Sequence, residues 1–332
     1  RAMNQSVNPC VSLTDKKQFY WFNVFDTPVK TYDTLSELLD EYFYETGVLD
    51  RTKQLSKNIY QLIKRELDKN SSKLEKLTQE RLSASDSEIL RIKGDLIVEH
   101  QAELTKGKSD FEAYSYEVNQ TISIQLDRLA TPIENAQAYY KRYKKIKASI
   151  SHLTLQIERT KNEIDYFETL LQQIEMASLN DLLEMIEELK QNHYLHEKPT
   201  KTKKNRPQYD TYYTSDKTEI LVGKNNLQNE YITHQLAKHN ETWFHVKNQP
   251  GSHVLVRKID ALTEEDIRSA AQLASYFSSA RHSSSVPVDY TLIRYVKKVP
   301  GMKGSFVTYT HQKTIYIDPD DDITRKILKK RD

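Results

Sequence analysis

The 332-residue chain contains a single cysteine, Cys10. One cysteine excludes an internal disulfide and a cysteine-based zinc finger, and it fits a reducing compartment. Glycine is also scarce, with 7 residues in the chain, about 2% where proteins average about 7%. No apolar run approaches the roughly 20 residues that span a membrane, and no stretch resembles a signal peptide. The composition therefore predicts a largely helical, soluble and cytoplasmic protein without membrane insertion.

Net charge is small overall, at +2, but it is unevenly distributed. Residues 1–197 carry 26 Lys and Arg against 32 Asp and Glu, and residues 198–206 carry five cations. Residues 207–332 carry 18 cations against 15 anions, a net charge of +3. The basic excess therefore lies in a short linker and in the last third of the chain, where contacts with an anionic partner are expected.

Helical periodicity dominates the first part of the chain. Apolar residues recur at three- and four-residue spacings from Arg51, and between Tyr139 and Ile174 they hold a strict alternation of four and three. Five heptads of this kind predict a coiled coil. Because two such segments flank a compact insert, residues 51–192 are predicted to form a long antiparallel coiled-coil hairpin. Its small tip subdomain, residues 84–131, should hold a helix over 89–104 and a β-hairpin.

A shorter region precedes this arm. Residues 18–25, QFYWFNVF, are aromatic and strand-like, and Thr34 is expected to cap a short helix. Residues 1–50 are therefore interpreted as the tail end of another module. Their first three residues look like a cloning remnant.

A period of two follows the arm. After a basic linker, residues 193–208, seven short segments with strand-like alternation extend to the end of the chain. Two helices interrupt them, over 225–237 and 263–280. The fold class is thus α+β, with residues 209–332 forming a compact domain of mainly antiparallel sheet and two helices.

Residues 223–256, GKNNLQNEYITHQLAKHNETWFHVKNQPGSHVLV, concentrate amides, imidazoles and aromatic rings. A metal site is not expected there, because His234 and His239 are five residues apart and a helix turns them roughly 140° away from each other. Nucleophilic catalysis is not expected either, since Ser252 and His253 are neighbours on a predicted strand and point to opposite faces. We therefore predict no enzyme activity, no metal and no cofactor.

A binding surface accounts for more of these residues. Gly223 ends a predicted strand and Asn225 caps the next helix, so the first-turn amides and Lys224 would form an anion site suited to phosphate. The alternative, weighed evenly, is that Asn225 is only a cap and Lys224 is solvated. Trp243 and Phe244 alternate on a strand, and Trp243 lies either in the core or on a binding face. Amides and imidazoles beside basic residues are typical of a site for RNA backbone.

Several long motifs resemble a known family. GKNNLQNEYIT, TWFHVKNQPGSHVLV, VDYTLIRYVKKVPGMKGSFVTY and KTIYIDP resemble the NFACT-R domain, the C-terminal module of the NFACT proteins. LDRLATPIENAQAYYKRYKKIK resembles the coiled-coil middle module of that family, and DTLSELLDEYFYE resembles the close of its N-terminal module. The resemblance covers nearly the whole chain. The bacterial members of the family are often named fibronectin-binding protein A, and this chain resembles a streptococcal one. The resemblance divides the chain into an N-terminal remnant (1–50), the arm (51–192) and NFACT-R (209–332).

The resemblance implies a non-catalytic role in ribosome-associated quality control. The expected partners are the obstructed large ribosomal subunit and tRNA, and the expected process is C-terminal alanine tailing of stalled chains by a cytoplasmic, ribosome-associated protein. Because most of the N-terminal module is missing, the fragment is not expected to support tailing alone. By motif position, the residues expected to form or support the nucleic-acid surface are Lys224, Asn225, Asn226, Gln228, Asn229, Trp243, His245, Gly251, Ser252, His253, Arg294, Lys297, Lys298 and Lys303.

Two other function classes stay open. Streptococcal members of the family are described as cell-surface adhesins and virulence factors that bind fibronectin or fibrinogen without a signal peptide. That activity would have to arise from the folded C-terminal half. The third possibility is a coiled-coil spacer with a protein-interaction head. Salt-dependent tRNA binding would favour the first class, whereas saturable fibronectin binding by residues 207–332 would favour adhesion.

Overall fold

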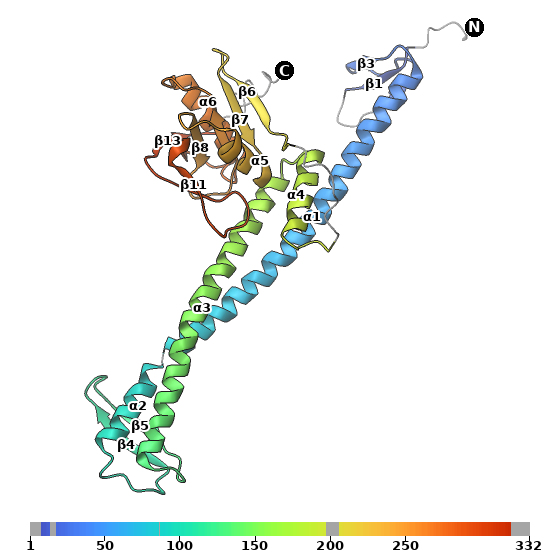
Figure 1. Cartoon of the computed structure of the whole chain (residues 1–332). Coiled ribbons are helices and arrows are strands. Elements are labelled where there is room, and N and C mark those ends of the chain that lie inside the picture. Colours follow the sequence, from blue (N-terminus) through green and yellow to red (C-terminus); the bar gives the residue numbers. More distant parts are fainter. Residues whose placement is uncertain (1–7, 14–17, 86, 197–205, 320–332) are drawn as a thin grey trace. The chain divides into compact units, whose positions relative to one another are not determined.

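The structure, a computed structural model, describes residues 8–13, 18–85, 87–196 and 206–319. The chain divides into two compact units, one made of residues 1–64 and 168–332 and the other of residues 65–167. Two long helices, α1 (Leu35–Ser85) and α3 (Pro132–Ile174), pass from one unit into the other (Figure 1).

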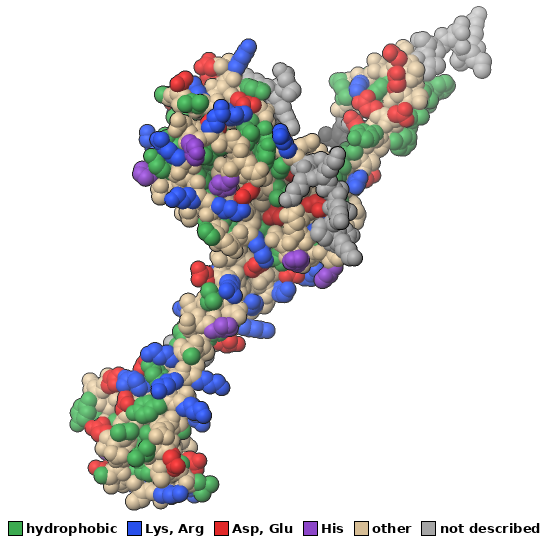
Figure 2. All heavy atoms as spheres, viewed as in Figure 1, with side chains coloured by type: hydrophobic (Ala, Val, Ile, Leu, Met, Phe, Trp, Pro, Cys, Tyr) green, Lys and Arg blue, Asp and Glu red, His purple; other side chains and the backbone are tan. Residues whose placement is uncertain are grey.

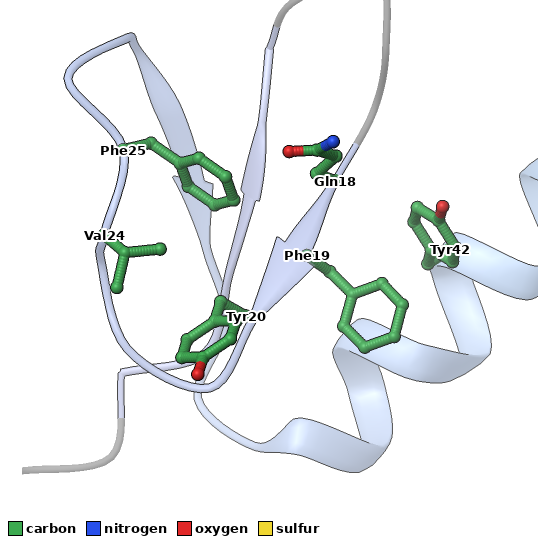
Figure 3. A pocket seen from close by; sticks show the side chains of 6 residues that line it. All are labelled: Gln18, Phe19, Tyr20, Val24, Phe25 and Tyr42. Carbon is green, nitrogen blue, oxygen red and sulfur yellow. The ribbon is translucent and has the colours of Figure 1, made fainter.

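The first unit begins with a small antiparallel sheet of order β2-β1-β3. Phe19 packs against Tyr42 of α1, with ring centroids 4.7 Å apart, beside an open hollow lined by apolar and aromatic side chains and one amide (Figure 3). The aromatic segment 18–25 supplies only the shortest strand, so most of it is not strand. The three strands are β1 (Cys10–Ser12), β2 (Phe19–Tyr20) and β3 (Val29–Thr31).

α1 is one helix of 51 residues, which corrects the expected short helix. Thr34 caps it as predicted, because its hydroxyl accepts a hydrogen bond from the Glu37 amide at 3.2 Å. No proline occurs in the helix, and the space around Gly47 is open. A single glycine costs only about 1 kcal/mol, too little to end a long helix. The expected boundary at residue 50 therefore falls inside continuous helix.

The second unit is a helical hairpin with a β-hairpin at its tip. The later part of α1 leads into the tip elements, and α3 returns the chain in the opposite direction (Figure 1). Strand pairing sets Phe111 opposite Ile124 and Ala113 opposite Ile122, which places an apolar face against the helices. The predicted β-hairpin is confirmed, although the preceding helix ends five residues early. The tip elements are α2 (Glu88–Glu99), β4 (Asp110–Ser115) and β5 (Gln120–Gln125).

The heptad positions of α3 form one buried or half-buried stripe. Tyr139, Ile157 and Thr160 are at most 8% exposed, and Leu153 is half-buried between them. Asn70 of α1 is buried as well. A three-four alternation returns to the same side of a helix every seven residues, so this stripe is the seam that the spacing predicted.

α4 (Leu179–Gln191) follows α3 and belongs to the first unit. Ser178 and Asp181 form a capping box at its start, each side chain bonding the other residue's backbone amide. Asp181, Glu184 and Glu188 follow one another at three- and four-residue spacings, so they lie along one face of the helix. The predicted linker, residues 193–208, comes next, and most of it lies outside the described residues.

The C-terminal domain is built on an antiparallel six-stranded sheet of order β13-β10-β8-β9-β7-β6. Only neighbours in this order pair, and each pairing is antiparallel, as the alternating sequence predicted. A separate two-stranded sheet joins β11 (Val296–Lys298) and β12 (Val307–Tyr309). The six strands are β6 (Asp210–Tyr213), β7 (Glu219–Gly223), β8 (Thr242–Val246), β9 (His253–Val256), β10 (Val286–Leu292) and β13 (Lys313–Ile317).

Each face of this sheet buries its own apolar cluster. Phe244 faces α6 (Glu264–Tyr276) together with Val222 and Val254. Trp243 faces the other way and packs with Leu221. The predicted separation of Trp243 from Phe244 is therefore confirmed.

Two elements differ from their predicted form. The helix expected over 225–237 is α5 (Asn226–Tyr231) followed by a π-helical turn, Ile232–Leu236. The strand expected over VDYTLIRYV leaves the large sheet at a 3-10 turn, Ile293–Tyr295, after which β11 pairs only with β12. Local periodicity cannot predict which strand a segment pairs with, because β10 and β11 show the same alternation of apolar and polar residues.

Candidate nucleic-acid interface

The start of α5 is an interior structure. Asn225 caps the helix by accepting a hydrogen bond from the Gln228 amide at 2.9 Å, and the Gln228 side chain accepts one from the Lys224 amide at 2.9 Å. Asn225 and Gln228 are at most 1% exposed. The capping prediction is confirmed, but the polar side chains of this turn do not face solvent.

Lys224 is neither solvated nor open to an external anion. Its Nζ lies 3.0 Å from Asp181 Oδ2 and 3.2 Å from Asp210 Oδ2, and its side chain is 13% exposed. Burial raises the pKa of Asp181, but the Lys224 ammonium and hydrogen bonds from Ser178 and Gln228 outweigh this and hold it below its usual value. The anion-site interpretation of Lys224 is therefore corrected, because two carboxylates already occupy its ammonium.

Asn226 connects three segments of the first unit. Its Nδ2 donates to Glu188 of α4 at 2.9 Å, and its Oδ1 accepts from Gln173 of α3 and from the Ser305 hydroxyl, each at 3.1 Å. Gly304, with φ +77°, lies so close that an added Cβ would approach the Asn226 amide to 3.2 Å. The amide cluster thus binds α3, α4 and the turn after β11 together.

The same network continues into the sheet. Asn229 accepts a hydrogen bond from the His253 amide at 3.0 Å and donates to Ser305 at 3.3 Å. His253 Nδ1 lies 2.8 Å from the Thr233 hydroxyl. Gly223 lacks a Cβ that would approach Asn229 to 2.5 Å, which explains glycine at that position. Asn229 and His253 are at most 3% exposed, so neither reaches solvent.

Trp243 is fully buried between two imidazoles. Its ring stacks on His245 with centroids 5.5 Å apart and meets His253 edge to face at 5.2 Å. Its Nε1 has no hydrogen-bond partner in the part of the chain that the structure describes. Burial lowers the pKa of His245 to about 4 and holds that of His253 well below its usual value, so both are neutral at pH 7. Neither imidazole then supplies charge for a phosphate.

The predicted glycine turn is likewise closed. Gly251 forms a β-bridge with Ser278, and the Ser252 amide donates to the Phe277 carbonyl at 3.0 Å. Ser252 is 4% exposed. The donors expected there bind the end of α6 instead of facing solvent.

Four predicted cations lie farther along the chain and differ in accessibility. Lys298 is exposed but pairs with Glu230 at 2.8 Å, and half-buried Lys303 bonds the Tyr194 hydroxyl and lies 4.6 Å from its ring centroid. Arg294 and Lys297 are exposed, and neither has an ion-pair partner among the described residues. The accessible charge of the predicted site is therefore centred on Arg294, Lys297 and Lys298.

Further basic side chains adjoin this group. They were not assigned to the site from the sequence. The Arg294 amide donates to the His239 carbonyl at 3.3 Å, which brings the exposed loop of Lys238 and His239 beside the turn 293–295. Tyr295 stacks on exposed His311. In Figure 2, Lys, Arg and His side chains are spread over the visible face of this domain, among hydrophobic and some acidic side chains. Sequence spacing alone gave no signal that these loops meet.

The second unit has a cationic surface of its own. Lys141, Arg142, Lys144 and Lys145 of α3 are exposed, and no ion pair in the described chain includes them. At 100° per residue they span about 160° of the helix, and Figure 2 shows Lys and Arg side chains along this part of the unit. A helix face of uncompensated cations suits a polyanionic partner.

The described residues were also searched for metal sites and for helices that could cross a membrane. They include no group of three His, Cys, Asp or Glu side chains placed to bind a metal ion. Their helices also include none with the length and hydropathy to cross a membrane.

Comparison with known proteins connects this geometry to a family. The family model described as NFACT N-terminal and middle domains matches residues 1–208, and the NFACT protein RNA binding domain matches residues 208–310. Rqc2 homolog RqcH of Bacillus subtilis is 39% identical over 96% of this chain, and RqcH of Streptococcus pneumoniae is 37% identical over 96%. The chain spans 57% of the length of each.

A solved structure shows the same fold. It is the C-terminal part of the fibronectin/fibrinogen-binding protein of Streptococcus suis, with a TM-score of 0.67 and 35% identity. The match covers 83% of this chain and 99% of that one.

Proposed function

Because this chain belongs to the NFACT family, we propose that it is the non-catalytic, RNA- and ribosome-binding part of a ribosome-associated quality control factor. The finer proposal is that it binds the obstructed large ribosomal subunit and tRNA in the cytoplasm and supports alanine tailing of stalled chains in the complete protein. The observation that carries it is that Arg294 and Lys297, on the domain that matches the RNA-binding model, are exposed and have no ion-pair partner among the described residues.

The predicted residues divide into two roles in this proposal. Arg294, Lys297 and Lys298 contact phosphates, because they are exposed on one hairpin and its preceding turn. The amide cluster around Asn226 and the Trp243 stack support the surface from inside, since they are buried and mutually bonded. Counterion release by the exposed cations makes the binding salt-dependent.

Filter binding of tRNA across a salt series tests the proposal. Each phosphate contact contributes about 0.7–0.9 to the slope of log affinity against log salt concentration. Arg294→Glu with Lys297→Glu should therefore reduce the slope by roughly 1.4 to 1.8. Lys247→Glu is the matched control, because Lys247 is exposed at the opposite end of β8 and β10 from Arg294. The assignment would be refuted if tRNA affinity did not depend on salt concentration, or if the control and the double variant lost equal affinity.

Adhesion is the second candidate, and one observation favours it. The solved relative is named a fibronectin/fibrinogen-binding protein. Saturable binding of fibronectin at physiological salt, abolished by unfolding and retained by Arg294→Glu with Lys297→Glu, would support an adhesin that uses a different surface. Co-sedimentation of this chain with large ribosomal subunits, lost in the same double variant, would support the ribosomal role.

A further inference from the structure

Two exposed loops of the C-terminal domain hold an aromatic pair whose purpose the fold does not explain. Tyr295, at the end of the turn 293–295, stacks on His311, which lies between β12 and β13. Their ring centroids are 4.2 Å apart and their planes differ by 25°. His311 is exposed and Tyr295 is half-buried, so the imidazole is the outer ring of the pair.

The backbone holds this pair in place. The Thr310 amide donates to the Tyr295 carbonyl at 3.3 Å, and His311 Nδ1 lies 3.0 Å from the Thr310 hydroxyl. His311 has φ +58°, a left-handed conformation that most non-glycine residues avoid but that histidine adopts more readily than most. The turn therefore fixes the direction of the imidazole.

Positive charge surrounds the stacked rings. The Arg294 guanidinium lies over the Tyr295 ring at 5.1 Å, and the loop of Lys238 and His239 adjoins it. Lys297 follows on β11, and Lys313 begins β13.

The neighbouring carboxylates do not cancel this charge. Glu241 is bonded by Arg257 and by the Lys238 amide, and Glu230 pairs with Lys298. Asp289 is 1% exposed and bonded by the Tyr309 and Thr314 hydroxyls, and among the described residues it forms no ion pair with these cations. The platform therefore combines an open ring with uncompensated cations.

We propose that the Tyr295–His311 pair is a stacking site for an unpaired RNA base, with the phosphates on either side of that base held by Arg294 and Lys297. This assignment rests on the proposed RNA-binding function and deepens it. Aromatic rings bind unpaired bases through their π-faces, whereas a duplex keeps its bases stacked inside. The proposal therefore selects single-stranded loops or ends over helical RNA at this surface.

The experiment compares three ligands of equal length, about 12 nucleotides, by fluorescence anisotropy with the whole chain. They are single-stranded oligoadenosine, an abasic ribose-phosphate strand of equal charge, and a blunt A-form duplex. The unmodified protein should prefer oligoadenosine to the abasic strand. His311→Asn should reduce oligoadenosine affinity by about 5- to 150-fold, the range for one lost base stack. It should leave abasic-strand affinity unchanged.

The choice of variants keeps the outcome clear. Asparagine tolerates positive φ, so His311→Asn removes the ring without disturbing the turn. Tyr295→Leu is the second variant, and Tyr316→Leu, an exposed tyrosine on β13, is its control. Binding of oligoadenosine that neither His311→Asn nor Tyr295→Leu weakens would overturn the stacking site while leaving RNA binding intact. Absence of binding to every RNA would overturn the proposed function and, with it, this site.

Discussion

Replacing Lys224 with methionine should destabilise the C-terminal domain strongly, because two buried carboxylates would lose their cationic partner. Asp181 is 2% exposed and Asp210 is 6% exposed, and the Lys224 ammonium lies within 3.2 Å of both. Methionine keeps much of the aliphatic volume and removes the charge. Breaking a buried ion pair by removing one partner costs about 3–5 kcal/mol, so the free energy of unfolding should fall by roughly that amount at pH 7.

The pH dependence of this loss gives a sharper signature. The folded-state pKa of Asp181 lies below its usual value, so its ionised form stabilises the protein above the unfolded pKa. That stability is lost as pH falls through the folded pKa. Without Lys224 the pKa of Asp181 should rise, because burial then acts with less opposition. The difference in unfolding free energy between wild type and Lys224→Met should therefore shrink as the pH is lowered toward 4.

Urea denaturation followed by tryptophan fluorescence measures the effect without screening the ion pair by salt. The chain has two tryptophans, and Trp243 is buried whereas Trp21 is 53% exposed. Both proteins should therefore carry Trp21→Phe, so that Trp243 alone reports on the C-terminal domain. Lys247→Met, at an exposed site, is the control and should change stability by no more than about 0.5 kcal/mol.

The refuting result combines two measurements. A loss below about 1 kcal/mol, the scale of an exposed pair, would show that Lys224 is not an interior cation. If tRNA binding by Lys224→Met also lost one phosphate contact from its salt slope, the anion-site interpretation would be restored. We expect the opposite pattern, a large loss of stability and no change in salt slope.

Two further changes test the packing of the tip and of the sheet domain. Gly94→Ala should destabilise the second unit by about 1–3 kcal/mol in thermal unfolding, because the new Cβ would lie 2.7 Å from the Tyr140 ring; Gly47→Ala, at a helical position of α1 with open space around it, should be tolerated. Thr263→Ala should cost about 1 kcal/mol in urea denaturation by removing the α6 capping box, whereas Thr263→Ser should retain most of that stability; equal losses in alanine and serine variants would contradict the capping role.

The patterns that depend on local spacing were the ones that the sequence predicted well. The heptad spacing predicted the long helices, and the alternation of apolar and polar residues predicted the strands. Thr263 followed by Asp266 predicted the start of a helix. These features follow from interactions within a few residues of one another. The length of α1 was underestimated because aromatic and polar residues around Gly47 resemble a break, although nothing there forbids a helix.

The site was harder to predict because its polar residues are satisfied by distant partners. Asn, Gln and Lys in one run ordinarily indicate an exposed turn. Here the carboxylates that bind them lie about 40 residues earlier, on α4, where Asp181, Glu184 and Glu188 look like the solvated face of an amphipathic helix. The carboxylates and the amides, each taken alone, would be predicted to lie on the surface. Only their pairing in the structure shows that both lie in the interior. The signal that the sequence did offer is an acidic helix face, followed about 40 residues later by an amide-rich helix start that it could pair with.

The buried amide cluster has a mechanical consequence for RNA binding. Asn226 bonds Glu188 on α4, Gln173 on α3 and Ser305 in the turn that follows β11. The hairpin that carries Lys297 and Lys298 is therefore anchored through Ser305 to the same amide that holds the two helices. A displacement of α4 would strain this hydrogen-bond set, because unsatisfied buried polar groups cost about 1–3 kcal/mol each. The exposed cations are thus positioned by the helices as well as by the sheet, so most residues of the predicted site are buried supports of the surface that carries those cations.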